Sequence, residues 1–367
     1  MKVLILTESA DRSRYWEAAL PILRSRNIDA WFAALRTSGA IMPVLEKKGI
    51  PTLAFGAESS SNYPSTFWRL VKLLKAEKFD VVHASEAIQS TIAGMACLFV
   101  NTKCVFHYHH TYVTGMQSRY SFTGSKLSDV VMAVSRSSQQ ATIKNDGTPV
   151  RKTFVAYNGI DPLREVSEGE NRELRRRLNV PDSAKLVTVV ARLREEKGHR
   201  TLFDACRIAT AAIREPLHLV VVGDGEERAK LVNESSKFVE FKTHFVGHQD
   251  DVAQYYSAAD VVAMPSYFEP FGLVAVEAMV CGKALVASNV EGPAEIIENG
   301  ISGILVPPKD AAALSDALVK VFDSPEWARE IGENARKRVL EKFTMETMVE
   351  SWIDCYKSVL DRPGNNN

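Results

Sequence analysis

The chain has 367 residues and no formal net charge, with 46% hydrophobic and 25% charged residues. This composition is typical of a soluble globular protein with two domains of ordinary size. The longest apolar run, near residues 92–100, is too short to span a bilayer, and five scattered cysteines argue against a disulfide framework. A strand predicted from Lys2 leaves no room for a signal peptide, so we expect the protein in the reduced cytoplasm.

The charge is unevenly divided between the two halves. Residues 1–165 hold 20 basic and 13 acidic residues, whereas residues 166–367 hold 25 basic and 32 acidic residues. A basic half beside an acidic half suggests two domains with different partners, and the basic half suits an anionic acceptor or a membrane surface. Chance variation in surface charge explains the division equally well.

The first half alternates predicted strands with predicted helices. We expect strands at 2–7, 29–35, 52–55, 80–83, 103–108 and 130–134, and helices at 13–26 and 65–77. Such alternation indicates a parallel sheet covered on both faces. The helix at 65–77 carries Phe67, Leu70, Val71 and Leu74 on one face and Arg69, Lys72, Lys75 and Lys78 mainly on the other. This pattern fits contact with an anionic membrane, and it is more typical of a crossover helix with a solvated basic face.

The second half repeats this plan. We expect strands at 186–190, 217–222, 261–264, 284–287 and 303–306, with helices between them. Two doubly wound domains in tandem would face each other across a cleft. A turn-rich stretch at 158–162 is the expected link and the expected hinge for domain closure.

The stretch Ser266-Tyr-Phe-Glu-Pro-Phe-Gly-Leu-Val-Ala-Val-Glu-Ala278 follows an apolar strand and carries two carboxylates, Glu269 and Glu277. It has the layout of a ligand site at the carboxyl end of a parallel strand, with a helix N-terminus facing the ligand. Glu277 lies about 12 Å further along by helical rise, so the two carboxylates would hold different parts of one ligand rather than form a glycosidase pair. A single Glu in such a loop is more often simply solvated.

Two further loops follow strands of the second half. Arg192 offers a planar fork and Lys197 a point charge on a strand-to-helix loop, which together suit a diphosphate without a metal ion. Alone, such a loop is more often a solvated basic segment. Gly223 and Gly225 end the next strand and would let the backbone approach a ligand, which is a weak signal.

Three histidines, His107, His109 and His110, cluster after the strand at 103–108. A histidine held neutral can donate a hydrogen bond to a sugar or phosphate oxygen. Only His107 and His109 share a face of a strand, and no further ligand has zinc-site spacing, so we expect one functional histidine and no metal. His83, with Glu86, ends the preceding strand and would line the same cleft.

Six short motifs in order resemble those of family 4 of the retaining glycosyltransferases, which have the GT-B fold. They are Asn158-Gly-Ile-Asp161, Ala191-Arg-Leu-Arg-Glu-Glu-Lys-Gly198, Val222–Gly225, Ala259–Ser266, Glu269-Pro-Phe-Gly-Leu-Val-Ala-Val-Glu-Ala278 and Asn299–Pro307. The resemblance is specific over about 150 residues of the second half, and looser in the first half. It implies an α/β protein of two tandem Rossmann-like domains.

The resemblance also implies a role for each matching residue. Arg192 and Lys197 would hold the donor diphosphate, together with backbone N–H groups near Gly272 and Leu273. Glu269 and Phe271 would meet the donor sugar, Glu277 the ribose, and His109 the reacting sugar. The first-strand loop departs from the family, because residues 8–14 lack the usual glycine pair. Arg12 and Arg14 would replace those amides and, with His83, serve the acceptor side.

These observations predict a metal-independent retaining hexosyltransferase. The expected domains are an acceptor domain at 1–162 and a donor domain at 163–344, and the resemblance implies that a last helix at 345–367 crosses back to the acceptor domain. The expected co-substrate is a nucleotide-diphosphate sugar, with UDP favoured over GDP, and no cofactor is needed. The expected partners are a glycan or lipid-linked acceptor of cell-surface polysaccharide or lipopolysaccharide synthesis and the inner face of an anionic membrane, but no nucleic acid. The alternatives are an inactive nucleotide-sugar-binding relative and a GT-B phosphorylase or epimerase.

Overall fold

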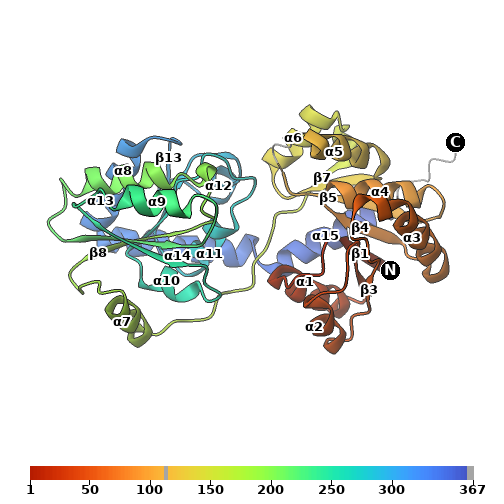
Figure 1. Ribbon diagram of the computed structural model, residues 1–367, viewed down its shortest axis with the longest axis horizontal. Helices are drawn as coiled ribbons and strands as arrows, with labels where there is room; N and C mark the ends of the chain where they lie inside the picture. Colours follow the sequence, from red (N-terminus) through yellow and green to blue (C-terminus); the bar gives the residue numbers. More distant parts are fainter. Residues whose placement is uncertain (111–114, 362–367) are drawn as a thin grey trace. The chain divides into compact units, whose positions relative to one another are not determined.

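The computed structural model describes residues 1–110 and 115–361, and the chain divides into two compact units (Figure 1). Unit 1 comprises residues 1–159 together with the segment that begins at Met345, and unit 2 comprises residues 160–344. The first boundary falls within the turn-rich stretch at 158–162. The last helix belongs to unit 1, whereas residues 362–367 of the predicted C-terminal segment lie outside the described residues.

Unit 1 is built on a seven-stranded parallel sheet in the order β3-β2-β1-β4-β5-β6-β7. The strands are β1 Lys2–Thr7, β2 Asp29–Ala34, β3 Thr52–Ala54, β4 Val81–Ser85, β5 Lys103–Tyr108, β6 Val130–Ala133 and β7 Thr153–Val155. Continuous apolar runs such as Val-Leu-Ile-Leu in β1 are typical of strands that are buried on both faces. The short β7 lacks such a run, and the sequence analysis did not anticipate it.

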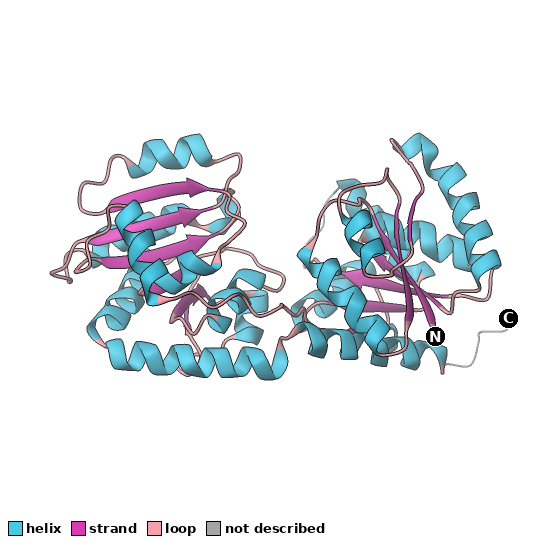
Figure 2. Cartoon of the chain, turned by 90° about the horizontal axis from the view of Figure 1, so that it is seen from below, coloured by secondary structure: helices cyan, strands magenta, loops and turns pink. Residues whose placement is uncertain are grey.

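Helices cover both faces of this sheet (Figure 2). They are α1 Arg14–Ser25, α2 Ile41–Lys47, α3 Tyr63–Glu77, α4 Ala87–Cys97, α5 Gly115–Leu127, α6 Arg136–Asp146 and α15 Met345–Leu360, with short 3-10 turns η1 Ser60–Asn62 and η2 Val150–Lys152. Helices α1, α2 and α15 bury apolar side chains on one face, and α3 and α4 bury theirs on the other.

Helix α15 is anchored to unit 1 by aromatic side chains. Trp352 and Tyr356 are fully buried, and the Trp352 ring lies 5.7 Å from that of Trp16 on α1. Burying large aromatic side chains contributes on the order of 2–3 kcal/mol each, so α15 is an integral part of the unit 1 core.

Unit 2 has a six-stranded parallel sheet in the order β10-β9-β8-β11-β12-β13. The strands are β8 Lys185–Val190, β9 Leu217–Val222, β10 Lys242–Gly247, β11 Val261–Met264, β12 Leu285–Ser288 and β13 Ile304–Val306. Strand β10 was not anticipated, because it is an edge strand of Lys-Thr-His-Phe-Val-Gly that is nowhere fully buried and has no apolar run.

The helices of unit 2 are α7 Glu168–Arg177, α8 His199–Ala209, α9 Arg228–Ser235, α10 Ala253–Ala258, α11 Leu273–Val280, α12 Glu291–Ile296, α13 Ala311–Asp323 and α14 Pro325–Lys342, with a 3-10 turn η3 Glu195–Lys197. Helices α8 and α13 pack over one face of the sheet and α7 and α10 over the other. The two units together are an α/β protein of two Rossmann-like domains, as the sequence predicts.

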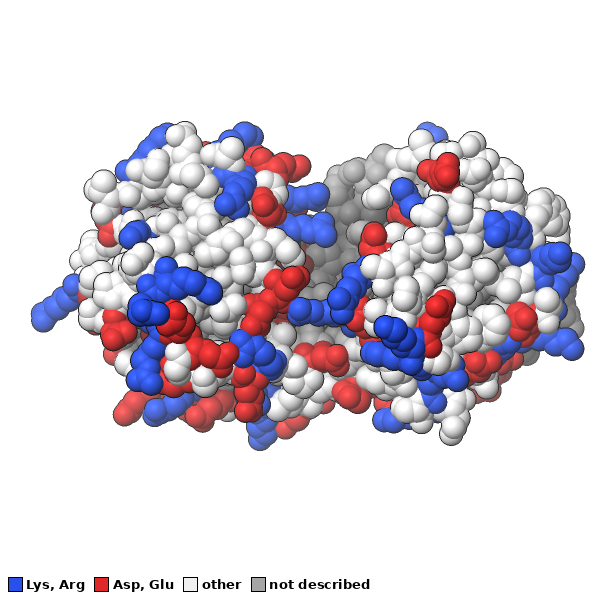
Figure 3. Space-filling model, turned by 60° about the horizontal axis from the view of Figure 1, so that its bottom comes forward, with Lys and Arg blue, Asp and Glu red and all other residues white. Residues whose placement is uncertain are grey.

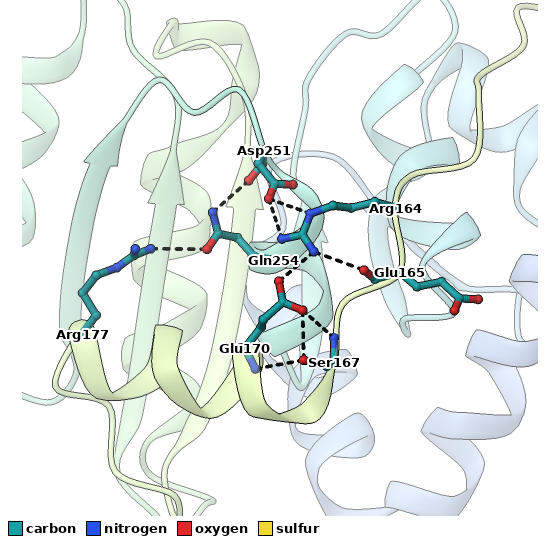
Figure 4. Close-up of polar contacts among 7 residues, drawn as sticks. All are labelled: Arg164, Glu165, Ser167, Glu170, Arg177, Asp251 and Gln254. Atoms are coloured by element: carbon teal, nitrogen blue, oxygen red, sulfur yellow. Dashed lines mark hydrogen bonds and ion pairs between the residues drawn. The ribbon is translucent and has the colours of Figure 1, made fainter.

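A polar network secures the segment that leads into α7 (Figure 4). Arg164 donates to Asp251 at 2.6 Å and to Glu170 at 2.8 Å, and Glu170 completes a capping box with Ser167. The segment from Arg164 onward is therefore held against unit 2.

The charge asymmetry of the sequence follows the two units. Unit 1 holds 21 basic and 15 acidic residues, and unit 2 holds 24 and 30. The face drawn in Figure 3 intersperses both signs over each unit. Among the described helices, none is long and apolar enough to cross a membrane.

Candidate active site

The order of the strands locates one candidate site in unit 2. From β8 the chain winds to β9 and β10 on one side and later to β11, β12 and β13 on the other. The point where the winding reverses lies between β8 and β11, and ligands of open α/β sheets bind outside the carboxyl ends of the strands at that point. The loops there are residues 191–198 and 265–272, which carry the predicted donor residues.

An ion pair joins these two loops. Lys197 Nζ lies 2.6 Å from Glu269 Oε2, and both side chains are about four-fifths buried. The backbone supports this contact, because the Tyr267 N–H donates to the Glu196 carbonyl at 2.7 Å. Gly198 makes the approach feasible: it has φ +69°, and a Cβ there would lie 2.0 Å from the Pro265 carbonyl oxygen. Lys197 and Glu269, from two different loops, thus meet at one point of this edge.

The second carboxylate of the motif lies on α11. Glu277 accepts a hydrogen bond from the buried Tyr256 hydroxyl at 2.9 Å, which orients its side chain. Burial, and then the neighbouring Glu277 charge, raises the pKa of Tyr256 well above its usual value, so the hydroxyl stays a donor. Glu277 is held one helical turn inside the start of α11.

The N-terminus of α11 lies at the same edge. Gly272 caps the helix with φ +102°, and Leu273 is its first residue and is partly exposed. The first N–H groups of a helix have no intrahelical acceptor and favour an anion. Gly272 and Leu273 therefore occupy positions suited to a phosphate group.

The Phe271 side chain and the two glycines after β9 pack against other parts of the chain. The Phe271 side chain is buried and packs 6.0 Å from the Phe343 ring, so only its backbone can meet a ligand. Gly223 and Gly225 make room for the chain itself: a Cβ would lie 1.9 Å from the Ala191 carbonyl oxygen and 2.5 Å from that of Leu193. These glycines let the 191–198 loop pack closely. Arg192, on that loop, is exposed at its surface.

Unit 1 has a corresponding reversal between β1 and β4. Glu86 follows β4 and accepts from His110 Nε2 at 2.6 Å. This hydrogen bond raises the pKa of His110. Burial alone would raise the pKa of Glu86, but the hydrogen bond from His110 and the nearby histidines lower it overall. Glu86 and His110 thus favour a charged pair, and Glu86 has the unusual φ of +77°, typical of a constrained functional position.

His109 lies beside this pair, directly after β5. Its ring is 4.0 Å from that of His107, and its side chain is half-buried. Burial lowers the pKa of His109, although the Glu86 charge opposes the shift. His109 is therefore neutral near pH 7 and can donate one hydrogen bond while accepting another.

His83 does not line a surface, contrary to the sequence-based expectation. It is fully buried, with Nδ1 2.5 Å from the Tyr356 hydroxyl and Nε2 2.9 Å from His107 Nδ1. Burial lowers the pKa of His83 to about 3, so it is a neutral core residue that ties β4 and β5 to α15. Its position on a strand facing α15 could not be read from the sequence, because α15 lies more than 250 residues away.

The two predicted arginines lie in the segment after β1. Arg12 is exposed and donates to Glu17 at 3.0 Å, and Arg14 is the exposed first residue of α1. A third cation, Arg36 after β2, contacts Glu8 after β1 at 2.6 Å. The sequence analysis missed Arg36 and, in unit 2, Glu291, whose carboxylate accepts from the Glu269 N–H at 3.2 Å. Both follow the carboxyl end of a strand, which is the signal that would have identified them.

Among the described residues, no three His, Cys, Asp or Glu side chains gather as metal ligands. The edge of unit 2 instead presents Lys197, Arg192 and a helix N-terminus for anionic groups and two oriented carboxylates for hydroxyl groups. That set of groups suits a sugar joined to a diphosphate.

Comparison with known proteins leads to the same class. A family model described as glycosyl transferases group 1 matches residues 170–338, and one described as glycosyltransferase family 4 matches residues 14–164. The glycogen synthase of Mycobacterium tuberculosis is 30% identical over 76% of this chain and 68% of that protein. The N-acetyl-alpha-D-glucosaminyl L-malate synthase of Bacillus anthracis is 28% identical over 80% of this chain and 78% of that protein.

Solved structures are similar over nearly the whole chain. Anabaena Alr3699/HepE, crystallised in complex with UDP, has a TM-score of 0.82 and 26% identity, covering 98% of this chain and 100% of that one. The same protein has been solved with UDP-glucose. The two folded units and their edge sites define a GT-B transferase. The chain belongs to glycosyltransferase family 4 and is an enzyme of the hexosyltransferase class.

Proposed function

We propose that this enzyme moves a hexose from a UDP-hexose to a hydroxyl group of a glycan or lipid-linked acceptor, with retention of configuration and without a metal ion. The observation that carries the proposal is the Lys197–Glu269 pair, held at 2.6 Å where the winding of the unit 2 sheet reverses. UDP is favoured over other bases because Anabaena Alr3699/HepE, 26% identical to this chain, was crystallised with UDP and with UDP-glucose.

The donor contacts follow from the chemistry of unit 2. Lys197, Arg192 and the first N–H groups of α11, at Gly272 and Leu273, would neutralise the diphosphate as it departs. Their positive charge stands in for a metal ion. Glu277, oriented by Tyr256, would accept from the ribose hydroxyls, and Glu269 from the hydroxyls of the transferred sugar.

Unit 1 would supply the acceptor side. His109, neutral because of its burial, would donate a hydrogen bond to the reacting sugar. Arg12 and Arg14, in a first-strand loop without glycine, favour an acceptor that carries an anionic group. The name of the Bacillus anthracis relative includes the carboxylate L-malate, which supports an anionic acceptor.

The proposed location is a reducing cytoplasm, which suits the five free cysteines of the chain.

The test is a donor panel followed by product analysis. The purified chain is incubated with UDP-glucose, UDP-galactose, UDP-N-acetylglucosamine and GDP-mannose, with and without EDTA, and nucleotide release is measured. With an acceptor identified, NMR of the product gives its anomeric configuration. We expect UDP release unaffected by EDTA, an α-linked product, and a raised donor KM in Glu277→Ala but not in the exposed α14 variant Glu330→Ala.

Each part of the proposal has a result that would overturn it. Turnover of GDP-mannose alone would refute the base, loss of activity in EDTA would refute metal independence, and an inverted product would refute retention. Donor binding without transfer or hydrolysis would indicate an inactive binding relative. Release of a sugar phosphate when inorganic phosphate is added would indicate a phosphorylase.

A further inference from the structure

An exposed aromatic cluster lies on the helical layer formed by α3 and α4 in unit 1, which pack side by side (Figure 1). The rings of Phe67, Trp68 and Phe99 contact one another, with centroids 5.0 to 5.8 Å apart. Trp68 is 60% exposed, Leu98 70% and Phe99 53%, and Met95 on α4 is also exposed. Several large apolar side chains gathered at one place on a surface mark an interaction site, whereas single exposed ones do not.

The charges within this surface have one sign. Residues 59–76 and 87–102, which form it, contain no Asp or Glu and include the cations Arg69, Lys72 and Lys75. The next residue of α3, Glu77, is paired with Lys2 at 2.7 Å. Arg69 lies over the Phe55 ring. Among the described residues, no carboxylate pairs with Lys72 or Lys75. Trp68, Val71, Lys72, Lys75 and Ala76 line an open groove of about 460 Å³. We call the surface formed by the exposed side chains of Trp68, Lys72, Lys75, Leu98 and Phe99 the aromatic-basic patch.

The patch is not the apolar stripe that the sequence suggested for membrane contact. Leu70, Val71 and Leu74 of that stripe are buried against the sheet, as a crossover helix requires. Trp68, on the outer side of the same helix, meets Phe99 from the turn after α4, a residue 31 positions away. Only the packing of α3 against α4 brings the aromatic and basic groups together.

We propose that the aromatic-basic patch docks unit 1 on the surface of an anionic lipid bilayer. Trp and Phe side chains partition into the boundary between headgroups and acyl chains, and lysines beside them are attracted to anionic headgroups. Lys72 and Lys75 have flexible stems that can lie along the apolar surface while their ammonium groups reach the headgroups. The uniform positive sign selects an anionic bilayer over a protein surface of mixed charge or a second copy of this patch, which like charges would repel.

The proposal deepens the lipid-linked part of the proposed function but is tested without it. The full chain, with no sugar donor present, is co-sedimented with vesicles of phosphatidylcholine alone and with vesicles that also contain phosphatidylglycerol. The variants are Lys72→Glu/Lys75→Glu and Trp68→Ser/Phe99→Ser. The charge control is Lys47→Glu/Lys144→Glu on α2 and α6, and the apolar control is Val239→Ser/Ile301→Ser in unit 2, where both side chains are exposed.

We expect the wild-type chain to bind the vesicles that contain phosphatidylglycerol and not the vesicles of phosphatidylcholine alone. Lys72→Glu/Lys75→Glu should weaken it about thirtyfold or more, because each basic residue near the surface contributes about 1 kcal/mol. Trp68→Ser/Phe99→Ser should weaken it about tenfold or more, and the two controls should change it less than about twofold. The four substituted patch positions, Lys72, Lys75, Trp68 and Phe99, are exposed, so the unfolding temperature of both patch variants should remain that of the wild type.

Three results would overturn the proposal. They are no binding of the wild type to anionic vesicles, equal binding to both kinds of vesicle, and equal losses in the variants and their controls. Concentration-dependent dimerisation that Trp68→Ser/Phe99→Ser abolishes, without vesicle binding, would assign the patch to a second copy of the chain. Vesicle binding without sugar transfer would leave this proposal standing while refuting the proposed function.

Discussion

The carboxyl edges of the two sheets contrast in how their polar groups are held. In unit 2, Lys197 and Glu269 come from two loops that are pressed together, with Gly198 against Pro265. In unit 1, Glu86 and His110 form a pair beside the half-buried His109. Two neutral histidines, His83 and His107, are buried beneath His109 and contact each other. The first edge holds a fixed ion pair, which we propose as part of a binding site for a charged ligand. The second keeps a neutral imidazole in position, which suits contact with an uncharged sugar.

Similar topology therefore supports different electrostatic surroundings, because both edges carry a paired carboxylate and in unit 1 neutral imidazoles also lie beside and behind it. A parallel sheet places loop residues at its carboxyl edge in both units. Whether these residues are charged or neutral depends on what lies behind them. In unit 2 the Lys197–Glu269 ion pair is retained although both side chains are about four-fifths buried, whereas in unit 1 burial keeps His83 and His107 neutral.

The largest expected effect is on the fixed site of unit 2. Glu269→Gln keeps the size of the side chain but removes the charge that faces Lys197 and replaces one of the two acceptor oxygens with an NH2 donor. We expect kcat to fall about 100- to 1000-fold, as for loss of one preorganised group that contacts the reacting centre. Steady-state kinetics with the preferred donor measure the change.

A matched variant at the same edge makes this test specific. Glu291→Gln alters a carboxylate that contacts the backbone of Glu269 rather than Lys197, so its effect should be about tenfold or less. Near wild-type turnover in Glu269→Gln, or equal losses in the two variants, would contradict the role given to the ion pair.

Close packing of the two unit 2 loops can be broken by one methyl group. Gly198→Ala combines a left-handed φ of +69° with a Cβ only 2.0 Å from a backbone oxygen, whereas Gly49→Ala has φ +75° and open space. We expect Gly49→Ala to lose about 1 kcal/mol of stability and Gly198→Ala about 3 kcal/mol or more, with weaker donor binding. Thermal unfolding and UDP titration distinguish the two variants. Equal losses of stability in Gly198→Ala and Gly49→Ala would show that the two loops can move apart without a cost in stability.

The neutral histidines of unit 1 predict a pH effect. The pKa of His83 is about 3 in the folded chain and near its ordinary 6.5 when unfolded, so the unfolded chain binds the extra proton first as pH falls. Stability present above pH 6.5 is therefore lost as pH falls toward 3, by about 2 kcal/mol between pH 6.5 and 5 from this group alone.

His83→Gln removes that titration. The variant should be less stable than wild type at pH 7, and the gap between their unfolding temperatures should narrow at pH 5. His248→Gln, at a histidine whose side chain is 78% exposed, is the control and should keep a constant gap. A His83→Gln gap that stays unchanged from pH 7 to 5 would mean that His83 is not kept neutral by the fold.

The smallest expected effect concerns the orientation of Glu277. Tyr256→Phe removes one hydroxyl donor and leaves the ring packed. We expect a loss of about 1 kcal/mol in stability and a donor KM raised about threefold, with kcat unchanged. A fall in kcat instead would place Glu277 at the reacting centre rather than at the ribose. The edge of unit 2 would then act on the reacting sugar as well as on the nucleotide.

The sequence by itself determined the parts of this protein that short contiguous patterns encode. Apolar runs predicted most of the strands, and the 266–278 stretch indicated a ligand site at the end of β11, because both inferences rest on local chain direction and residue type. The sequence did not predict the short β7 or the edge strand β10, because neither has a buried apolar run. The functional roles assigned to Glu269 and Glu277 remain predictions that the variants above examine, and the role assigned to His109 also remains a prediction.

Tertiary structure alone decided which distant residues meet. It paired Lys197 with Glu269, 72 positions apart, and His83 with Tyr356, 273 positions apart. It buried His83, which the sequence had offered as a ligand contact, and it buried the side chain of Phe271. It also gathered Trp68 and Phe99 into one exposed patch. The physical reason is the same each time: burial and charge pairing are set by the neighbours that sheet order and helix packing bring together, and these neighbours lie far away along the chain.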